Sequence, residues 1–144
     1  MNIDQKCFYC MKDARLDNLM VEVCRLNKST VYLFKDQTFP GRCVVAYHDH
    51  CAELFQLPPS ELHEYMDEVA QVAEVIFKNL KPNKINYAIL GDLVPHTHVH
   101  LVPKYENGPL WGEAFCAKPL PVKTLPNDEF EELKKLLAKG LGAI

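Results

Sequence analysis

The stretch VPHTHVHLVP, residues 94–103, decides the fold of this chain, because it places His96, His98 and His100 at alternate positions. Alternation is typical of a β-strand, in which neighbouring side chains point to opposite faces and successive residues on one face lie roughly 6.5–7 Å apart. The three imidazoles are therefore expected on one face, where they can contact one extended anionic group. Three buried polar rings would cost desolvation free energy without improving a core. We interpret the row as a functional site carried by a strand.

Four further runs rich in β-branched and aromatic residues predict that this strand belongs to a sheet. Turn residues bound each run, and the predicted strands, with the histidine strand last, cover residues 20–26, 30–34, 42–47, 85–90 and 96–102. Short polar or Pro-Gly connections separate the first three, as in an antiparallel meander. A Gly-Asp turn separates the last two, which predicts a hairpin.

Two longer segments predict helices. Apolar residues recur at helical spacing after residues 58–60 (PPS), and residues 81–83 (KPN) end the pattern. Asn127 is expected to cap a second helix that Gly140 ends. Because no strand-helix-strand alternation recurs, we predict an α+β fold with a five-stranded antiparallel sheet and two helices. No repeat, low-complexity tract or linker divides the chain, so a single domain is expected over residues 1–144.

The apolar face of the first predicted helix is wider than one small sheet requires. Its main stripe comprises Leu62, Met66, Val69, Ala73, Ile76, Phe77 and Leu80. Tyr65, Val72 and Val75 lie beside this stripe and widen it. We expect part of the helix to pack against a second subunit in a homodimer. A deeply buried helix in a monomer is the alternative.

The composition limits the partners of such a domain. With 16 Lys+Arg and 19 Asp+Glu the formal net charge is −3, so no broad cationic field attracts nucleic acid or an anionic membrane. We expect neither partner, and any recognition of phosphate must be local. The N-terminal residues lack the pattern of a secretory signal, and no apolar run approaches the ~18 residues of a membrane span. A cytoplasmic location is expected, where reducing conditions disfavour disulfides among the six cysteines.

Two chemistries suit a row of histidines. In the first, one neutral imidazole attacks phosphorus while its neighbours donate hydrogen bonds to the phosphate oxygens. In the second, the row binds a catalytic metal ion that activates water.

The heptad HTHVHLV, residues 96–102, resembles the signature of the histidine triad (HIT) hydrolases and nucleotidyl transferases, His-φ-His-φ-His-φ-φ with φ apolar. Only Thr97 departs from it. The resemblance covers nearly the whole chain, including PGRCVVAYHDH at residues 40–50 and the predicted helix after it. It implies the HIT fold, in which His98 attacks the α-phosphorus of a nucleotide and water hydrolyses the nucleotidyl-histidine. His100 would bind phosphate oxygens and orient the site. The chemistry itself requires no metal.

The chain departs from the family pattern at Arg42 and in the loop at residues 90–95, and it follows the pattern at Asp36. Arg42 stands where hydrolase branches usually carry a fourth histidine; arginine cannot relay a proton, but its forked cation can clamp a phosphate or carboxylate. A solvated strand residue is the alternative. Asp36 occupies a position where the family often binds ribose hydroxyls with an acidic residue, and an exposed turn is the alternative. The loop at residues 90–95 lacks the polar residues that commonly hold substrate phosphates, so the base and leaving group are not predicted.

The spacing Cys7-Phe-Tyr-Cys10 allows two thiolates to hold one tetrahedral zinc ion, but a site needs two further ligands. In zinc-bearing HIT members and the related galactose-1-phosphate uridylyltransferases, a histidine after the third strand and the first triad histidine complete the site. The resemblance therefore implies a structural zinc held by Cys7, Cys10, His50 and His96. His48 could replace His50, and a reduced thiol pair without metal is the alternative.

These observations together predict a homodimeric nucleotide phosphoryl-bond hydrolase. The expected substrates are dinucleoside polyphosphates, nucleoside phosphoramidates or similar nucleotide conjugates, with His98 and His100 catalytic and Arg42, Asp36 and His100 binding substrate. Three alternatives remain: a nucleotidyl transferase of the same fold, a nucleotide-binding regulatory protein with little turnover, and a metal-dependent hydrolase.

Overall fold

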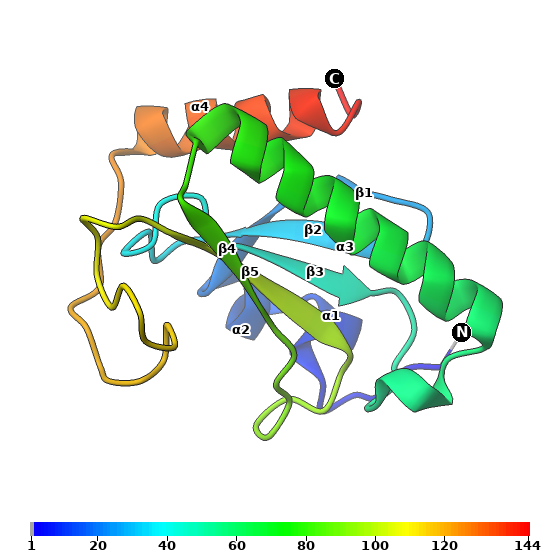
Figure 1. Cartoon of the computed structure of the whole chain (residues 1–144). Helices are drawn as coiled ribbons and strands as arrows, with labels where there is room; N and C mark the ends of the chain where they lie inside the picture. The colour runs from blue at the N-terminus through cyan, green and yellow to red at the C-terminus, as the bar shows by residue number, and fades with distance from the viewer. Residues whose placement is uncertain (1) are drawn as a thin grey trace.

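Five strands form one antiparallel sheet in the order β1-β2-β3-β5-β4 in the computed structural model, which describes residues 2–144 (Figure 1). The strands are β1 (Met20–Arg25), β2 (Ser29–Phe34), β3 (Cys43–Tyr47), β4 (Lys84–Ala88) and β5 (His98–Lys104). The predicted meander of the first three strands and the pairing of the last two are confirmed. The hairpin joins the meander through β5, which pairs with β3 and leaves β4 at the edge.

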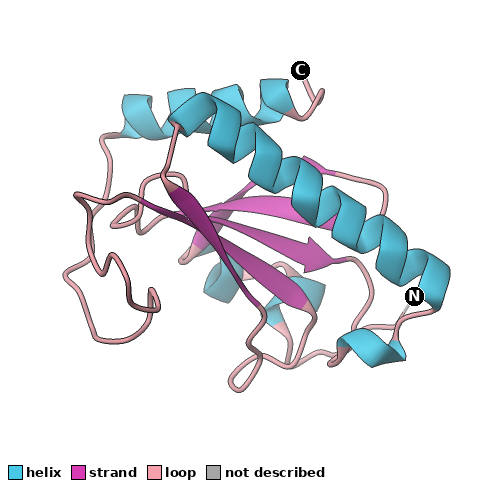
Figure 2. Ribbon diagram, viewed as in Figure 1, coloured by secondary structure: helices cyan, strands magenta, loops and turns pink. Residues whose placement is uncertain are grey.

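Helices cover both faces of the sheet (Figure 2). The two long ones, α3 (Pro59–Leu80) and α4 (Asn127–Gly140), lie together on one face, and the one-turn helices α1 (Phe8–Met11) and α2 (Ala14–Asp17) lie on the other. A 3₁₀ turn, η1 (Leu54–Gln56), precedes α3. The predicted α+β class and both long helices are confirmed, whereas the short helices escaped prediction because four residues carry too little periodicity. No helix within residues 2–144 has the length and apolarity needed to cross a membrane.

Alternation along the central strands divides the core into two layers. Toward α3 and α4 the sheet presents a large apolar cluster that includes Val31, Leu33, Cys43, Val45, Val99 and Leu101. Toward α1 and α2 it presents a smaller cluster that includes Tyr32, Val44 and Ala46, packed against Cys7, Tyr9 and Leu16. The histidine row belongs to the smaller layer, because His98 pairs with Ala46 and His100 pairs with Val44.

The buried stripe of α3 differs from the expected one. Tyr65 and Val72 lie in the core rather than beside it, and the Tyr65 hydroxyl donates a 2.8 Å hydrogen bond to the backbone oxygen of Val45. Met66 and Phe77, which the sequence assigned to the buried stripe, are 37% and 50% exposed. Relative to the predicted orientation, α3 is therefore rotated about its axis so that Tyr65 and Val72 face the core of the monomer. These two residues cannot contact a second subunit, so the expectation that they do is wrong.

The bounds of all five strands differ from the predicted ones by one or two residues at one or both ends, and the start of α4 differs as well. β5 begins at His98 rather than His96. Just before it, the N–H and the hydroxyl of Thr97 both donate to the backbone oxygen of Cys51 at 2.7 Å, while the backbone oxygen of Thr97 accepts from the N–H of Tyr47 at 3.0 Å. Asn127 is the first residue of α4 and not its cap; Pro126 occupies the cap position without a side-chain hydrogen bond.

Candidate active site and metal centre

The nucleophile expected from the sequence, His98, is held by a backbone acceptor. Its side chain is 5% exposed, and its Nδ1 lies 2.5 Å from the backbone oxygen of His96. A carbonyl oxygen can only accept, so Nδ1 carries the proton and Nε2 keeps its lone pair. Burial lowers the pKa of His98 because it disfavours the imidazolium form. The ring is therefore neutral and presents a free Nε2.

His100 has the opposite tautomer. The Nη2 of Arg42 lies 3.3 Å from the Nδ1 of His100. A guanidinium can only donate, so Nδ1 of His100 accepts and its Nε2 carries the proton. Burial, together with the charge of Arg42, lowers the pKa of His100 to about 3. His100 is thus a neutral hydrogen-bond donor, with its ring centroid 5.0 Å from that of His98.

Arg42 is fixed between two aromatic rings. Its guanidinium carbon lies 4.0 Å from the ring centroid of Phe34 and 4.9 Å from that of Phe115. Its Nε is buried and has no hydrogen-bond partner in the described chain, and no carboxylate within residues 2–144 forms a salt bridge with it. Burial lowers the pKa of Arg42. The solvated position considered for Arg42 is excluded, and the site holds a cation with unused hydrogen-bonding capacity.

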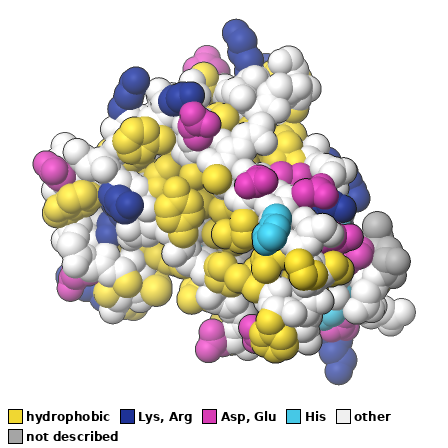
Figure 3. Space-filling view, turned by 45° about the vertical axis from the view of Figure 1, so that its right-hand side comes forward, with side chains coloured by type: hydrophobic (Ala, Val, Ile, Leu, Met, Phe, Trp, Pro, Cys, Tyr) yellow, Lys and Arg dark blue, Asp and Glu magenta, His cyan; other side chains and the backbone are white. Residues whose placement is uncertain are grey.

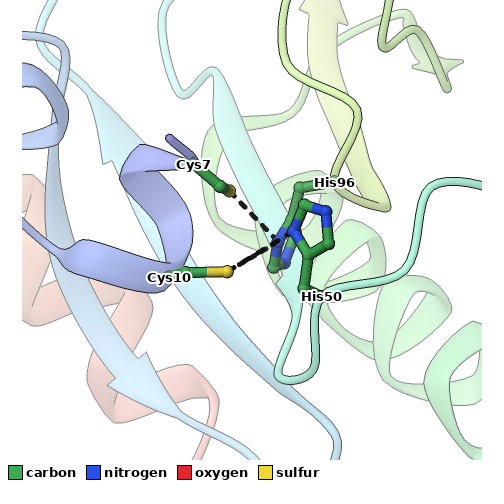
Figure 4. A group of neighbouring side chains, drawn as sticks. All are labelled: Cys7, Cys10, His50 and His96. Atoms are coloured by element: carbon green, nitrogen blue, oxygen red, sulfur yellow. Dashed lines mark hydrogen bonds between the residues drawn. The ribbon is translucent and has the colours of Figure 1, made fainter. Parts of the chain in front are cut away.

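Beside the triad, four possible metal ligands converge from three segments (Figure 4). Cys7 occupies the N-cap of the single turn of α1 and Cys10 lies within that turn, His50 follows β3, and His96 precedes β5. Their ligand atoms all lie within 4.8 Å of one another. The Nδ1 of His96 is 3.4 Å from the Sγ of Cys7 and 3.7 Å from that of Cys10, and the Nδ1 of His50 is 3.5 Å from the Sγ of Cys10. Tetrahedral zinc separates its sulfur and nitrogen ligands by roughly 3.3–3.8 Å, so the cluster fits zinc.

A hydrogen bond orients the imidazole of His96 for a metal, and a carboxylate lies near that of His50. The Nε2 of His96 donates to the backbone oxygen of Tyr47 at 2.7 Å, which leaves its Nδ1 as a lone-pair donor. Burial lowers the pKa of His96 to about 4, so the ring stays neutral, as a ligand must. The Nε2 of His50 lies 3.7 Å from a carboxylate oxygen of Asp4. His48 is not part of the cluster, and the structure therefore favours His50 over it.

Tyr9 joins the two centres. It lies between the cysteines in the sequence, and its buried ring is 5.2 Å from the ring of His96 and 4.9 Å from that of His98, measured between centroids. The segment that carries two possible metal ligands therefore also packs against His98. Tyr9 was not predicted, although its position inside the CFYC segment is a usable signal.

Two cavities lie near the triad. An apolar one of about 490 Å³ is lined in part by Phe8, Tyr9, Phe34, His98 and His100. The second, of about 430 Å³, is lined by Arg42 and by the remaining predicted binding residue, Asp36, but by no triad histidine. Its lining mixes three charged side chains, those of Asp36, Arg42 and Lys118, with apolar ones.

Asp36 does not line the apolar cavity. Its Oδ1 accepts hydrogen bonds from the backbone N–H of Thr38 at 3.0 Å, the hydroxyl of Thr38 at 2.6 Å and the backbone N–H of Lys123 at 3.2 Å. These bonds fix the carboxylate beside Arg42 in the second cavity. Phe115, which contacts Arg42 and lies 5.9 Å from the His100 ring, was not predicted, because no periodic pattern marks its segment.

Comparison with known proteins finds one family throughout. A family model described as a HIT domain matches residues 18–107. The chain is 34% identical over 77 residues to an uncharacterized HIT-like protein of Mycoplasma genitalium. It is 31% identical over 85 residues to bis(5′-nucleosyl)-tetraphosphatase (asymmetrical) of Schizosaccharomyces pombe. These alignments cover 50% and 56% of this chain and 55% and 47% of the relatives. The chain thus spans about half the length of the curated relatives it matches.

Solved structures share the fold. A histidine triad protein of Bradyrhizobium japonicum superposes with a TM-score of 0.82 at 21% identity, covering 89% of this chain and 95% of its own. A zinc-bound histidine triad family protein of Mycobacterium smegmatis superposes with a TM-score of 0.65 at 20% identity, covering 94% of this chain and 93% of its own. At these identities the likeness concerns the fold alone.

Proposed function

Because this chain belongs to the histidine triad (HIT) family, we propose that it hydrolyses a phosphoryl bond of a nucleotide through a covalent nucleotidyl-His98 intermediate. The observation that carries the proposal is the pair of opposite tautomers, a free Nε2 on His98 beside an N–H donor on His100. Attack on phosphorus needs both groups, a lone pair and a donor for the oxygen that gains charge. Dinucleoside polyphosphates, nucleoside phosphoramidates or similar conjugates are the proposed substrates.

The reaction proceeds in two displacements. Nε2 of His98 attacks the α-phosphorus, a P–N bond forms, and the bond to the leaving group breaks with its electron pair on the departing atom. His100 donates its Nε2 proton in a hydrogen bond to a non-bridging oxygen, and the cation of Arg42 behind it stabilises the charge. Water then attacks the same phosphorus, the P–N bond breaks, and the neutral ring of His98 is restored.

The two cavities give the substrate its orientation. The nucleobase binds in the apolar cavity between Phe8 and Phe34, which places the α-phosphorus above His98. Arg42 and His100 bind phosphate oxygens. Asp36, proposed to bind ribose hydroxyls, faces the cavity beyond Arg42, so it would contact a second ribose of a dinucleotide rather than the first.

We propose that Cys7, Cys10, His50 and His96 hold a structural zinc ion. Four protein ligands complete a tetrahedral shell and leave no position for water, which is typical of structural rather than catalytic zinc. When bound, the ion supplies a cross-link between the N-terminal segment and the sheet. The four residues orient the strand that presents His98 and do not contact substrate.

A homodimer stays part of the proposal, on different residues from those first considered. Hydrophobic side chains gather across the face presented in Figure 3. Phe77 of α3 and Tyr87 of the edge strand β4 are 50% and 55% exposed and line one cavity between these elements. A second copy of the chain would cover this apolar face. Light scattering after size exclusion tests the homodimer, with Tyr87→Glu expected to yield monomers.

The cytoplasmic location likewise remains a prediction.

Mass spectrometry of rapidly quenched protein tests the reaction. The protein is mixed with adenosine 5′-phosphoramidate or with diadenosine tetraphosphate, and His98→Asn is compared with His63→Asn, an exposed histidine of α3. We expect an acid-labile adduct of one nucleoside monophosphate in wild type and His63→Asn, and neither adduct nor product in His98→Asn.

The other outcomes separate the alternatives. Undiminished turnover in His98→Asn would contradict the covalent mechanism through His98. Product without a trapped adduct, lost at once on chelation, would favour a metal-dependent hydrolase. An adduct that reacts with added phosphate or sugar phosphate faster than with water would indicate a transferase, and tight nucleotide binding without product would indicate a binding protein.

A further inference from the structure

Thr97 is the one residue of the heptad HTHVHLV that departs from the apolar pattern, and the proposed reaction gives it no role. Thr97 is 2% exposed, and its Oγ1 donates a 2.7 Å hydrogen bond to the backbone oxygen of Cys51. The N–H of Thr97 donates to the same oxygen, also at 2.7 Å. An apolar residue at this position could supply only the bond from the N–H, so the hydroxyl adds a contact of its own.

The oxygen that Thr97 contacts belongs to the loop that carries a possible metal ligand. Cys51 follows His50 directly, after β3 has ended at Tyr47. Asn2 also holds this loop: the N–H of His50 donates to the backbone oxygen of Asn2 at 2.9 Å, and the Nδ2 of Asn2 donates to the backbone oxygen of His50 at 3.1 Å. Asn2 is exposed and Thr97 is buried, so the anchor at Thr97 is the one protected from competing water.

Thr97 also follows a metal ligand, His96, so its two bonds join the loops that carry both histidines of the cluster. The rings of His50 and His96 are 5.4 Å apart between centroids, yet both residues lie beyond the paired ends of β3 and β5, whose register stops at Ala46 and His98. Two loops joined by one hydrogen bond can pivot about it, and a second donor to the same oxygen removes that freedom. Ligands placed rigidly before the ion arrives bind it more tightly, because less ordering accompanies binding.

The same anchor reaches the proposed nucleophile, His98. The peptide group between His96 and Thr97 is bonded on both sides: its N–H donates to Cys51, and its oxygen accepts from the Nδ1 of His98 at 2.5 Å. The plane of this peptide sets the direction of its oxygen and therefore the orientation of the His98 ring. Donation from the N–H also polarises the peptide, which strengthens its oxygen as an acceptor.

We propose that Thr97 is a positioning residue whose hydroxyl holds His50 and His96 at the spacing of metal ligands and thereby raises the affinity of the cluster for zinc. The inference rests on the proposed zinc site and not on the identity of the substrate. Thr97 acts through the backbone oxygen of Cys51 and contacts neither the ion nor the substrate. Through the peptide that it shares with His96, the same anchor orients His98.

Zinc release from the loaded protein tests the proposal. Graded amounts of a chromophoric chelator give the zinc Kd at equilibrium, and an excess of it gives the release rate. Thr97→Val keeps the shape of the side chain and removes the hydroxyl, and it should raise the zinc Kd about tenfold, as the loss of a group that orients metal ligands typically does. Thr97→Ser keeps the hydroxyl and should keep a Kd close to that of wild type.

Thr38→Val is the matched control, because the hydroxyl of Thr38 also donates to a backbone oxygen, that of Pro121 at 3.0 Å, outside the metal cluster. It should leave the zinc Kd unchanged. A purely structural Thr97 would lower the stability of zinc-loaded and metal-free protein equally, whereas a positioning role makes the fall larger in the zinc-loaded protein. Thr97→Ala, which also lacks the hydroxyl and is smaller, takes the place of Thr97→Val if the latter does not fold.

Activity with zinc in excess tests the link to His98. With adenosine 5′-phosphoramidate, Thr97→Val should lower kcat about threefold and leave KM unchanged, because the ring of His98 is held less firmly while the contacts to substrate are kept. Thr97→Ser should retain the wild-type kcat.

The outcomes separate this inference from the proposals beside it. If wild type binds no zinc, the metal site fails and the role of Thr97 toward the metal fails with it. If wild type and Thr97→Val bind zinc with equal Kd, or if Thr97→Ser loses as much affinity as Thr97→Val, the positioning role is overturned and the zinc site stands. An unchanged kcat in zinc-loaded Thr97→Val would overturn the link to His98. Absence of turnover in wild type would contradict the proposed reaction and leave the zinc measurement decisive for Thr97.

Discussion

His98 takes its orientation from His96, because the Nδ1 of His98 donates a 2.5 Å hydrogen bond to the backbone oxygen of His96. His96 also presents its own Nδ1 to the Sγ of Cys7, 3.4 Å away. His96 thus belongs to the candidate metal cluster through its side chain and to the candidate active site through its backbone. A metal ion bound there would stiffen the proposed nucleophile, His98, without contacting the substrate.

Removing the metal is therefore expected to lower the thermal stability of the protein before it lowers its catalytic activity. We predict about one zinc ion per chain, and a fall in Tm of about 10 °C or more on chelation, because a structural ion contributes directly to the folding free energy. Elemental analysis and thermal unfolding with and without chelator measure both quantities.

Two substitutions, one inside the cluster and one outside it, serve as test and control for the zinc experiment. Cys10→Ser should lose the metal and reproduce the low Tm of the chelated protein, whereas Cys116→Ser, outside the cluster, should keep both metal and Tm. A wild-type protein that holds no zinc, with a Tm indifferent to chelator, would contradict the structural site.

Tyr9 is expected to position the nucleophile through its ring rather than its hydroxyl. Tyr9→Leu should lower kcat about tenfold while leaving zinc bound, because His98 loses the ring 4.9 Å from its own. Tyr9→Phe keeps the ring and should retain most of kcat. Zinc content must be measured alongside kcat, since the residue lies between two ligands. A Tyr9→Leu enzyme with unchanged kcat would show that the contact is only packing.

Arg42 is expected to serve activity at the expense of stability. Arg42→Met removes a half-buried cation that forms no salt bridge in the described chain and has a buried Nε without a partner, so it should raise Tm, while kcat/KM falls about tenfold or more because the phosphate loses its clamp. Arg42→Lys should not restore activity, because an ammonium cannot both stack on Phe34 and donate in a fork. Tm and kcat/KM are measured on wild type, Arg42→Met and Arg42→Lys. A fall of both Tm and kcat/KM in Arg42→Met would contradict the prediction.

The half-buried histidine His100 predicts how stability depends on pH. Its pKa is lowered to about 3 in the folded chain by burial and Arg42, whereas an unfolded histidine titrates near 6.5. Between these values the unfolded state binds a proton that the folded state does not. Stability is therefore full above about pH 6.5 and falls as the pH drops toward 3, by up to about 1.4 kcal/mol per pH unit.

His100→Asn isolates this contribution. Urea unfolding at pH 7.5 and pH 5 should show a smaller loss of unfolding free energy in the variant than in wild type, because the other titrating groups are shared. Identical losses in the two proteins would mean that His100 is protonated equally in both states.

The site illustrates what local patterns can and cannot reveal. The period-2 alternation predicted that His98 and His100 share a face, and the register of β5 on β3 confirms it, since they pair with Ala46 and Val44. The tautomers, by contrast, depend on a backbone oxygen two residues away and on a guanidinium from residue 42, which reaches the ring of His100 only once β3 and β5 have paired. Sequence carries no direct signal for such partners.

The amino-acid sequence by itself determined the α+β class, the meander and hairpin and the two long helices, because each rests on periodicity or turn chemistry within a short segment. It also indicated the family, through the resemblance of the contiguous motif HTHVHLV to the family signature. Only the tertiary structure decided that His50 rather than His48 joins Cys7 and Cys10, and that Tyr65 is core while Phe77 is exposed. It alone placed residues 115–120 opposite Arg42. These relationships join residues distant in the chain, so they depend on how strands register and how helices rotate against the sheet, which no local pattern specifies.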